Sequence, residues 1–255
     1  MLVAGASGFV GAALAELLVD QGHEVTAVTC RPASYLGAGT PVGADVQDAA
    51  TVRAAMAGQD AAYYLVHSLT ESNFAELDRT AARNFGEAAH ACRLRQVIYL
   101  GGLGADGDDL SEHLRSRREV EAILRDTTAT TALRAGIVVG DGGISWEILR
   151  QLVERLPVMI TPRWVQTRSQ PVALDDALYA LSGVLGRDDS IGEIYELGGS
   201  EGVRRSASCP GTSAGPGRRA RRSRRGSPRD RGRRAAHTAH RRARQVGSGS
   251  APSAG

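Results

Sequence analysis

The amino-acid sequence predicts an α/β protein built on a doubly wound parallel sheet. Two observations predict this class: short apolar runs alternate with stretches of helical period along residues 1–203, and a glycine-rich turn follows the first apolar run. Strands that alternate with helices of this length form βαβ units, whose helices cover both faces of a parallel sheet. Because such crossovers are right-handed, the doubly wound topology is favoured.

Each expected element has its own pattern. Short apolar or β-branched runs predict strands at residues 1–4, 24–29, 61–66, 96–100, 130–134, 137–139 and 194–197. Apolar residues at helical spacing predict helices at residues 8–22, 48–57, 71–92, 146–156 and 175–185, and one that starts after Ser111. Gly22 and Pro157 end two of these helices, and Ser111 is a suitable N-cap.

The charge divides the chain into two unlike parts. The 255 residues have a formal net charge of +3, and all 31 basic residues are Arg. Residues 1–203 hold 16 Arg against 27 Asp and Glu, a net charge of −11, whereas residues 204–255 hold 15 Arg against Asp230 alone, a net charge of +14. The second part has no Leu, Ile, Phe, Tyr, Trp or Met and cannot bury enough apolar surface to fold. We expect a folded domain at residues 1–203 and a disordered, Arg-rich tail at residues 204–255.

Three explanations compete for this tail. Its positive charge would neutralise phosphates, so it is a candidate for nucleic-acid binding. It is equally compatible with an inert linker. The third explanation is a frameshift, in which a GC-rich gene is translated out of frame, and it is favoured because the composition changes abruptly within the segment ELGGSEG.

The cysteines and the hydropathy pattern indicate a protein of the reducing cytoplasm. Cys30, Cys92 and Cys209 are odd in number and far apart, and no CxxC occurs, which argues against a disulfide framework or a metal site. No stretch approaches 18 consecutive apolar residues, so no membrane partner is expected.

The glycine-rich turn is the strongest chemical signal. Gly5-Ala-Ser-Gly8-Phe-Val-Gly11 stands between an expected strand and an expected helix, the context in which GxxGxxG has meaning. Gly5 permits a tight turn, Gly8 allows a pyrophosphate to approach the backbone, and Gly11 allows close packing of the helix. The free N–H groups of the helix start then bind phosphates. We expect a dinucleotide to be bound by Gly5, Ser7, Gly8, Phe9, Val10 and Gly11.

The end of the second strand bears on the choice of dinucleotide. An acidic residue there would bind the ribose 2′-hydroxyl of NAD, but the sequence has Val28-Thr29-Cys30-Arg31. Arg31 is suited to a 2′-phosphate, which favours NADP over NAD. The alternative is that Arg31 is a solvated loop residue.

Several blocks resemble the short-chain dehydrogenase/reductase superfamily, most closely its extended and atypical, NmrA-like and epimerase-like members. The matching blocks are LVAGASGFVG (2–11), GADVQD (43–48), AAYYLVHS (61–68), QVIYLGGLG (96–104), HLRSRREVEAILR (113–125), LRAGIVVG (133–140) and QPVALDDA (170–177). The resemblance implies a Rossmann fold, with Asp45 and Val46 beside the adenine. It also implies that Leu65, Val66 and His67 lie beside the ribose and that Gly136, Ile137 and Val138 lie near the nicotinamide.

At the catalytic positions, this sequence differs from the pattern of the family that it resembles. The family uses a Ser or Thr after the fifth strand and a Tyr-x-x-x-Lys on the next helix, whereas here the strand ends in Gly101-Gly102 and the chain has no Lys. In the resemblance, His113 stands in the Tyr position and Arg117 in the Lys position. Since these two share a helix face, His113 is a candidate proton donor and Arg117 a candidate ribose ligand. The alternative is that both are ordinary half-exposed helix residues.

Two classes of function follow. The first is an NAD(P)-dependent oxidoreductase or epimerase that acts on an unknown small molecule. Arg163, Trp164, Arg168 and Gln170, within residues 161–171, are candidates to line its substrate pocket. The second is a non-catalytic, dinucleotide-sensing regulator or assembly factor. Low or absent activity is expected of this chain, since the resemblance implies a C-terminal lobe that the tail replaces.

Overall fold

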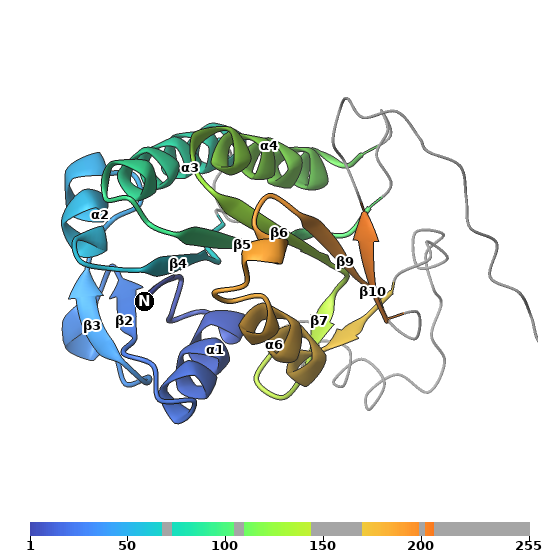
Figure 1. Cartoon of the computed structure of the whole chain (residues 1–255), viewed down its shortest axis with the longest axis horizontal. Coiled ribbons are helices and arrows are strands. Elements are labelled where there is room, and N and C mark those ends of the chain that lie inside the picture. The colour runs from blue at the N-terminus through green and yellow to red at the C-terminus, as the bar shows by residue number, and fades with distance from the viewer. Residues whose placement is uncertain (68–72, 105–109, 144–169, 199–201, 207–255) are drawn as a thin grey trace, which may run out of the picture. The chain divides into compact units, whose positions relative to one another are not determined.

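The computed structural model has one central sheet with helices on both of its faces (Figure 1). It describes residues 1–67, 73–104, 110–143, 170–198 and 202–206. The helix expected at residues 146–156, residues 161–169 and all of the tail beyond Ser206 lie outside the described residues.

The sheet has eight strands in the order β10-β9-β6-β5-β4-β1-β2-β3. In this order the strands are β10 (Gly202–Ser206), β9 (Ile194–Gly198), β6 (Thr130–Ala135), β5 (Gln96–Gly102), β4 (Ala61–Tyr64), β1 (Leu2–Ala4), β2 (Thr26–Thr29) and β3 (Thr40–Gly43). All neighbours are parallel except β10, which runs antiparallel to β9. A second, two-stranded sheet pairs β7 (Val138–Val139) with β8 (Val172–Ala173).

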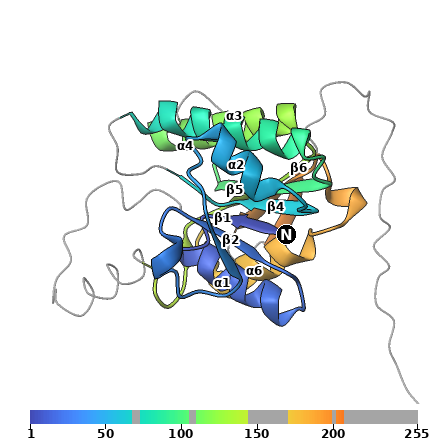
Figure 2. The same ribbon diagram turned by 90° about the vertical axis from the view of Figure 1, so that its left-hand side faces the viewer.

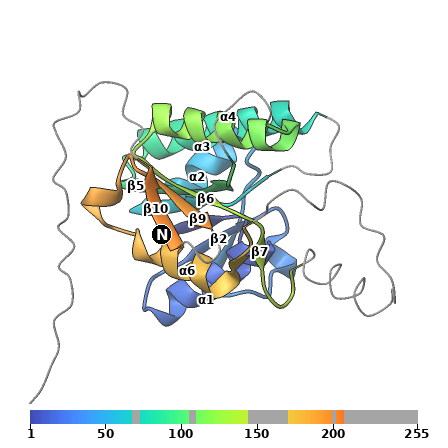
Figure 3. The ribbon, with the colours of Figure 1, turned by 90° about the vertical axis from the view of Figure 1, so that its right-hand side faces the viewer.

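The helices form two layers around the sheet. Figures 2 and 3 show α2 (Ala49–Met56), α3 (Phe74–Ala91) and α4 (Glu112–Thr127) on one face and α1 (Phe9–Asp20) and α6 (Leu174–Gly183) on the other. Two short 3₁₀ helices, η1 (Pro32–Ser34) and η3 (Asp188–Ser190), lie in connections. Within the described part of the chain, no helix has the length and apolar character needed to cross a bilayer.

The predicted doubly wound α/β class is confirmed, but three strands were missed. β3 contains Pro41 and Gly43 and one aliphatic residue, Val42, because it is an exposed edge strand with no buried face. β8 has only two residues, too few to form a pattern. β10 crosses the boundary expected between residues 203 and 204, so the regular structure extends to Ser206.

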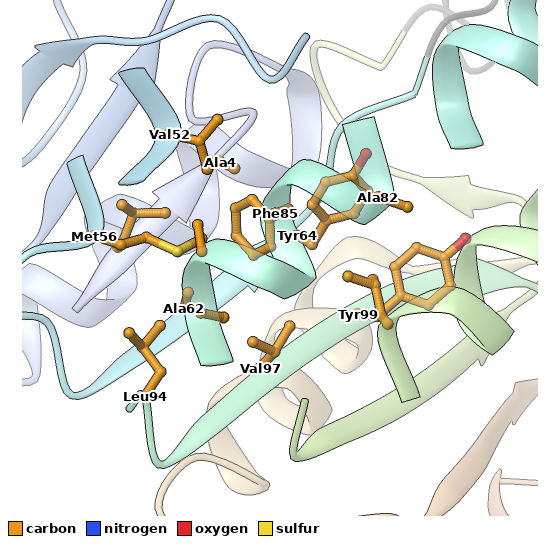
Figure 4. Packing of buried hydrophobic residues seen from close by; sticks show 14 of the residues in the cluster. Ala4, Val52, Met56, Ala62, Tyr64, Ala82, Phe85, Leu94, Val97 and Tyr99 are labelled. Carbon is orange, nitrogen blue, oxygen red and sulfur yellow. The ribbon is translucent and has the colours of Figure 1, made fainter. Parts of the chain in front are cut away.

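Each face of the sheet has its own apolar core. On the face covered by α2, α3 and α4, Tyr64 packs edge-on against Phe85, with ring centroids 4.8 Å apart, and Tyr99 lies 6.1 Å from Tyr64 (Figure 4). On the other face, the fully buried Tyr63 and Leu133 pack with residues of α1 and α6. Tyr63 and Tyr64 thus point to opposite faces, as successive residues of a strand do.

Gln96 is a fully buried polar residue that joins four segments. The two N–H groups of its Nε2 are shared among three acceptors: Thr131 Oγ1 on β6 at 2.8 Å, the Val184 carbonyl oxygen after α6 at 3.0 Å and Ser190 Oγ of η3 at 3.0 Å. Its Oε1 accepts from the Gly186 N–H at 2.8 Å. Since every polar atom of the side chain is satisfied, its burial stabilises the fold.

We expect the substitution Gln96→Leu to lower the free energy of unfolding by about 3 kcal/mol, because it leaves buried donors and acceptors without partners. Urea unfolding measures this loss. Gln21→Leu is the matched control, because Gln21 is exposed after α1, and its effect should stay within about 0.5 kcal/mol. Equal effects of the two substitutions would contradict the role assigned to Gln96.

Candidate functional site

A pocket of about 880 Å³ opens at the carboxyl ends of the central strands. The chain winds from β1 through β2 to β3 in one direction and through β4, β5 and β6 in the other, so β1 marks the point where the strand order reverses. Ligands of open parallel sheets bind at this point. The pocket is bounded by the glycine-rich turn after β1, by residues after β4 and β5, and by the N-terminal part of α4.

The glycine-rich turn brings two backbone segments into direct contact. Gly5 has φ +86°, a left-handed conformation that favours glycine, and its carbonyl accepts from the Gly8 N–H at 2.9 Å. A Cβ on Gly11 would overlap the carbonyl oxygen of Gly5, so α1 packs against the turn only because residue 11 is glycine.

The N-terminus of α1 is suited to an anion. Gly8 is its N-cap and supplies no side-chain acceptor, and no acidic residue occupies the first turn. The N–H groups there, together with the positive end of the helix dipole, favour a bound phosphate. The turn and the helix start therefore fit the pyrophosphate of a dinucleotide.

A second close approach shapes the wall across the pocket. A Cβ on Gly136, just after β6, would overlap the carbonyl oxygen of Gln170. Farther along, the Phe9 ring packs on the loop after β7, where a Cβ on Gly143 would lie 3.0 Å from Phe9 Cζ. These contacts bring the segments after β6 and β7 next to the start of α1.

Three basic side chains of the described residues line the pocket: His67 after β4, and His113 and Arg117 on α4. The His67 side chain is exposed along the wall, yet desolvation by the surrounding protein, followed by the positive charges of Arg117 and His113, lowers its pKa to about 4. Desolvation and Arg117 also lower the pKa of His113 below its ordinary value of 6.5, although Asp78 opposes the shift. Both imidazoles are therefore neutral at pH 7.

Buried polar contacts fix the position of α4. Ser111 caps the helix by accepting from the Leu114 N–H at 3.3 Å. One turn on, Ser116 Oγ donates to Asp78 Oδ2 of α3 at 3.0 Å, and both residues are buried. The contact sets α4 against α3, which directs His113 towards the pocket.

The far part of α4 is tied to the sheet. Arg134 of β6 donates from Nε and Nη2 to the two carboxylate oxygens of Glu121 at 2.9 and 2.8 Å. The Tyr99 hydroxyl of β5 donates to the Arg117 carbonyl at 3.0 Å, and Arg117 Nη1 lies 3.4 Å from the Leu100 carbonyl oxygen. Arg117 is thus held beside the end of β5.

Gly101 and Gly102 line the pocket where the related family has a hydroxyl residue. A Cβ on Gly102 would lie 2.7 Å from Leu114 Cδ2, and one on Gly101 would lie 2.9 Å from the Tyr99 ring. Neighbouring side chains fill the space of a serine at either position. Proton transfer at this wall would depend on other groups.

The structure brings most of the predicted site residues together. Those that line the pocket are Gly5, Gly8, Phe9, Val10, Gly11, Leu65, His67, His113, Arg117, Gly136, Ile137 and Val138. Ser7 is exposed outside the pocket lining, and Val66 packs against the apolar core. Arg31, Asp45 and Val46 lie at the same edge of the sheet, after β2 and β3, and do not line the pocket.

Glu196 lines the pocket and was missed by the sequence analysis, whereas Gln170 was a candidate and does line it. Glu196 is the one charged residue in the strand IYELG, the last parallel strand before the edge. A charge inside an otherwise apolar strand was the available signal. It was not decisive, because an edge position explains such a charge equally well.

An α/β fold whose glycine-rich turn opens on a pocket at the reversal of strand order defines a dinucleotide-binding protein. The model of a family described as NAD(P)H-binding matches residues 5–153, more than half of the chain. The chain belongs to this family, and its cofactor is NAD or NADP. No curated protein sequence matches it. Among the described residues, no group of three or more His, Cys, Asp or Glu side chains could hold a metal ion.

Solved structures share the fold. MoeE5 in complex with UDP-glucose and NAD is 20% identical, over 80% of this chain and 77% of that one, with a TM-score of 0.65. UDP-glucose 4-epimerase from Thermotoga maritima with UDP-glucose is 14% identical, over 80% and 78%, at 0.64. A short-chain dehydrogenase/reductase superfamily protein from Agrobacterium tumefaciens with bound NAD is 18% identical, over 80% and 78%, at 0.62. The chain thus has the fold of these epimerase-like proteins.

We expect Gly136→Ala to lower the free energy of unfolding by about 2 kcal/mol, because the added methyl group forces the backbone at Gln170 to move. Thermal or urea unfolding measures this loss in the free energy of unfolding. Gly183→Ala in α6 is the control, because nothing lies within 4 Å of a Cβ there. That change should be neutral or stabilising by up to about 1 kcal/mol. Equal destabilisation by both would contradict the close approach.

Proposed function

We propose that the chain is an NAD(P)-dependent oxidoreductase or epimerase of small molecules. In this proposal His113 and Arg117 replace the Tyr and Lys of the short-chain dehydrogenase/reductase catalytic pair. The observation that carries this proposal is that one pocket holds the glycine-rich turn, His113 and Arg117 together. A pocket that combines a phosphate-binding turn with perturbed titratable groups is a candidate active site.

The chain's own residues suit the cofactor. Gly5, Gly8 and Gly11 leave room for a pyrophosphate, and the wall at Gly136 and Val138 is free of charge where a nicotinamide would lie. The exposed Arg31, at the end of β2, supports a preference for NADP, since its guanidinium is available to a 2′-phosphate. The bound cofactor would supply the acceptor or donor of a hydride.

His113 would handle the proton. Because its imidazole is neutral at pH 7, it would accept the proton of a substrate hydroxyl during oxidation and return it to a carbonyl oxygen during reduction. Arg117 stays charged at any pH and would donate hydrogen bonds to ribose or substrate oxygens. It could not act as the acid or base.

A non-catalytic dinucleotide sensor is the second candidate, favoured by one observation. At Gly101 and Gly102 the hydroxyl of the related family is missing, and Tyr99 and Leu114 fill its space. Turnover separates the two candidates. Consumption of NADPH or NADH with any of a panel of aldehydes and ketones, or conversion of a nucleotide sugar to its epimer in the presence of NAD or NADP, supports the enzyme. Saturable cofactor binding with neither consumption nor epimer formation across the panel supports the sensor.

Nucleotide sugars belong in that panel because of the structural relatives. MoeE5 and the Thermotoga maritima epimerase were both solved with UDP-glucose. The shared fold supports a small-molecule substrate here, and identities of 20% and 14% favour no particular one.

We expect Gly8→Asp to weaken NADPH and NADH binding by about 100-fold or more. Two like charges about 4 Å apart repel by about 4 kcal/mol at an effective dielectric constant of 20. Stability should change little, because Gly8 has φ −82° and Asp is a good N-cap. Calorimetry measures affinity and thermal unfolding measures stability. Gly8→Ala should weaken binding far less, and unchanged affinity in Gly8→Asp would contradict cofactor binding at the turn.

We expect Arg117→Gln to raise the pKa of His113 and of His67, because the substitution removes a positive charge that disfavours both imidazolium ions. Both values should stay below 6.5, since desolvation remains. NMR titration of the imidazole C–H signals measures the shifts. Arg83→Gln, on the exposed face of α3, is the matched control and should leave both pKa values in place. Unchanged values in Arg117→Gln would show that Arg117 does not face the imidazoles.

A further inference from the structure

Two polar side chains line the pocket on the side of β9, away from the glycine-rich turn. They are Glu196 on β9 and Gln170 just before β8. Among the described residues, neither side chain has a hydrogen bond or ion pair. Gln170 is exposed, whereas Glu196 is half-buried, and burying part of a charged group without a partner costs free energy that a ligand would recover by supplying the partner.

The backbone brings the two side chains together. Glu196 and Gly198 are two residues apart on β9, so they face the same side of the sheet at a separation of about 7 Å. A Cβ on Gly198 would overlap Oε1 of Gln170, so the Gln170 amide occupies the place of the missing side chain. The Gln170 amide therefore lies on the same face of the sheet as the Glu196 carboxylate, two residues farther along β9.

Glu196 is flanked in the sheet by two arginines. Its register partner on β6, Arg134, donates to both carboxylate oxygens of Glu121 at 2.9 and 2.8 Å. Its register partner on β10 is Arg204. Glu196 is not among the charges that shift the pKa of His67 and His113.

We propose that Glu196 and Gln170 recognise the hydrogen-bond-donating groups of the substrate, whether hydroxyl or ammonium. The proposal rests on the proposed function, because it names the substrate chemistry of the same pocket. Leu103 and Leu114 also line it, and an apolar lining with a few convergent polar groups is typical of small-molecule sites. Hydrogen bonds to a carboxylate are stronger than those to a neutral acceptor, so Glu196 dominates the preference.

The sign of the charge makes the preference specific. Glu196 attracts a ligand that carries an ammonium group, accepts hydrogen bonds from a neutral polyol and repels a ligand carboxylate. Three six-carbon probes of nearly the same shape differ in this respect: glucosamine is a cation, glucose is neutral and glucuronate is an anion. The expected order of affinity is glucosamine, then glucose, then glucuronate.

The experiment measures binding of these three probes to the full chain loaded with NADPH, by saturation-transfer NMR with competition. The wild type should follow the stated order. Glu196→Gln should lower glucosamine affinity by about tenfold and leave the three probes nearly equal. Gln170→Ala should weaken all three without changing their order. Glu87→Gln, a carboxylate on the exposed side of α3, is the matched control and should preserve the wild-type pattern.

Three outcomes overturn the proposal: no probe binds the loaded wild type, glucuronate binds best, or Glu196→Gln keeps the order. A purely structural ion pair with Arg204 would show itself differently, because Glu196→Gln and Arg204→Gln would then lower the unfolding temperature equally and leave probe binding unchanged. Failure of the proposed function is a separate result, since it is measured by the absence of cofactor consumption and of epimer formation across the substrate panel, whatever the order of probe binding.

Discussion

At Gly11 and at Gly136 the chain passes so close to another backbone segment that no side chain fits. The first contact, with Gly5, lets α1 start at the end of β1 and point its free N–H groups at the pocket. The second, with Gln170, brings the segment before β8 to the end of β6. Without these two contacts the pocket would lose both the start of α1 and the wall that faces it.

The position of His113 and Arg117 in the pocket depends on α4, which is fixed by two buried polar contacts in its interior. Ser116 joins it to Asp78 of α3, and Glu121 joins it to Arg134 of β6. These contacts are buried, so breaking one of them leaves a buried polar group without its partner, which destabilises the fold. Such contacts favour one orientation of the helix over its alternatives. That orientation keeps His113 and Arg117 on the pocket wall.

Much of the fold was predictable from the sequence, because the helices and central strands bury regular apolar faces. β3 was not, since an exposed edge strand such as Thr40–Gly43 needs no apolar pattern. β10 was not either, because its pairing to β9 comes from backbone hydrogen bonds that any sequence can make. At the site, Gly5 and Gly11 were recognisable because their backbone geometry demands glycine. Glu196 was not, since its role depends on what lies across the pocket and not on its neighbours in the chain.

With both imidazoles neutral at pH 7, the charge on the described wall of the pocket is unevenly distributed. Arg117 acts on both His67 and His113 and lies at their end, whereas Glu196 lies apart from them. The described wall therefore carries a basic group at one end and an acidic group at the other. A ligand with an uneven charge distribution is favoured in one orientation and opposed in the reverse one. Under the proposed function, this asymmetry would orient a substrate as it enters.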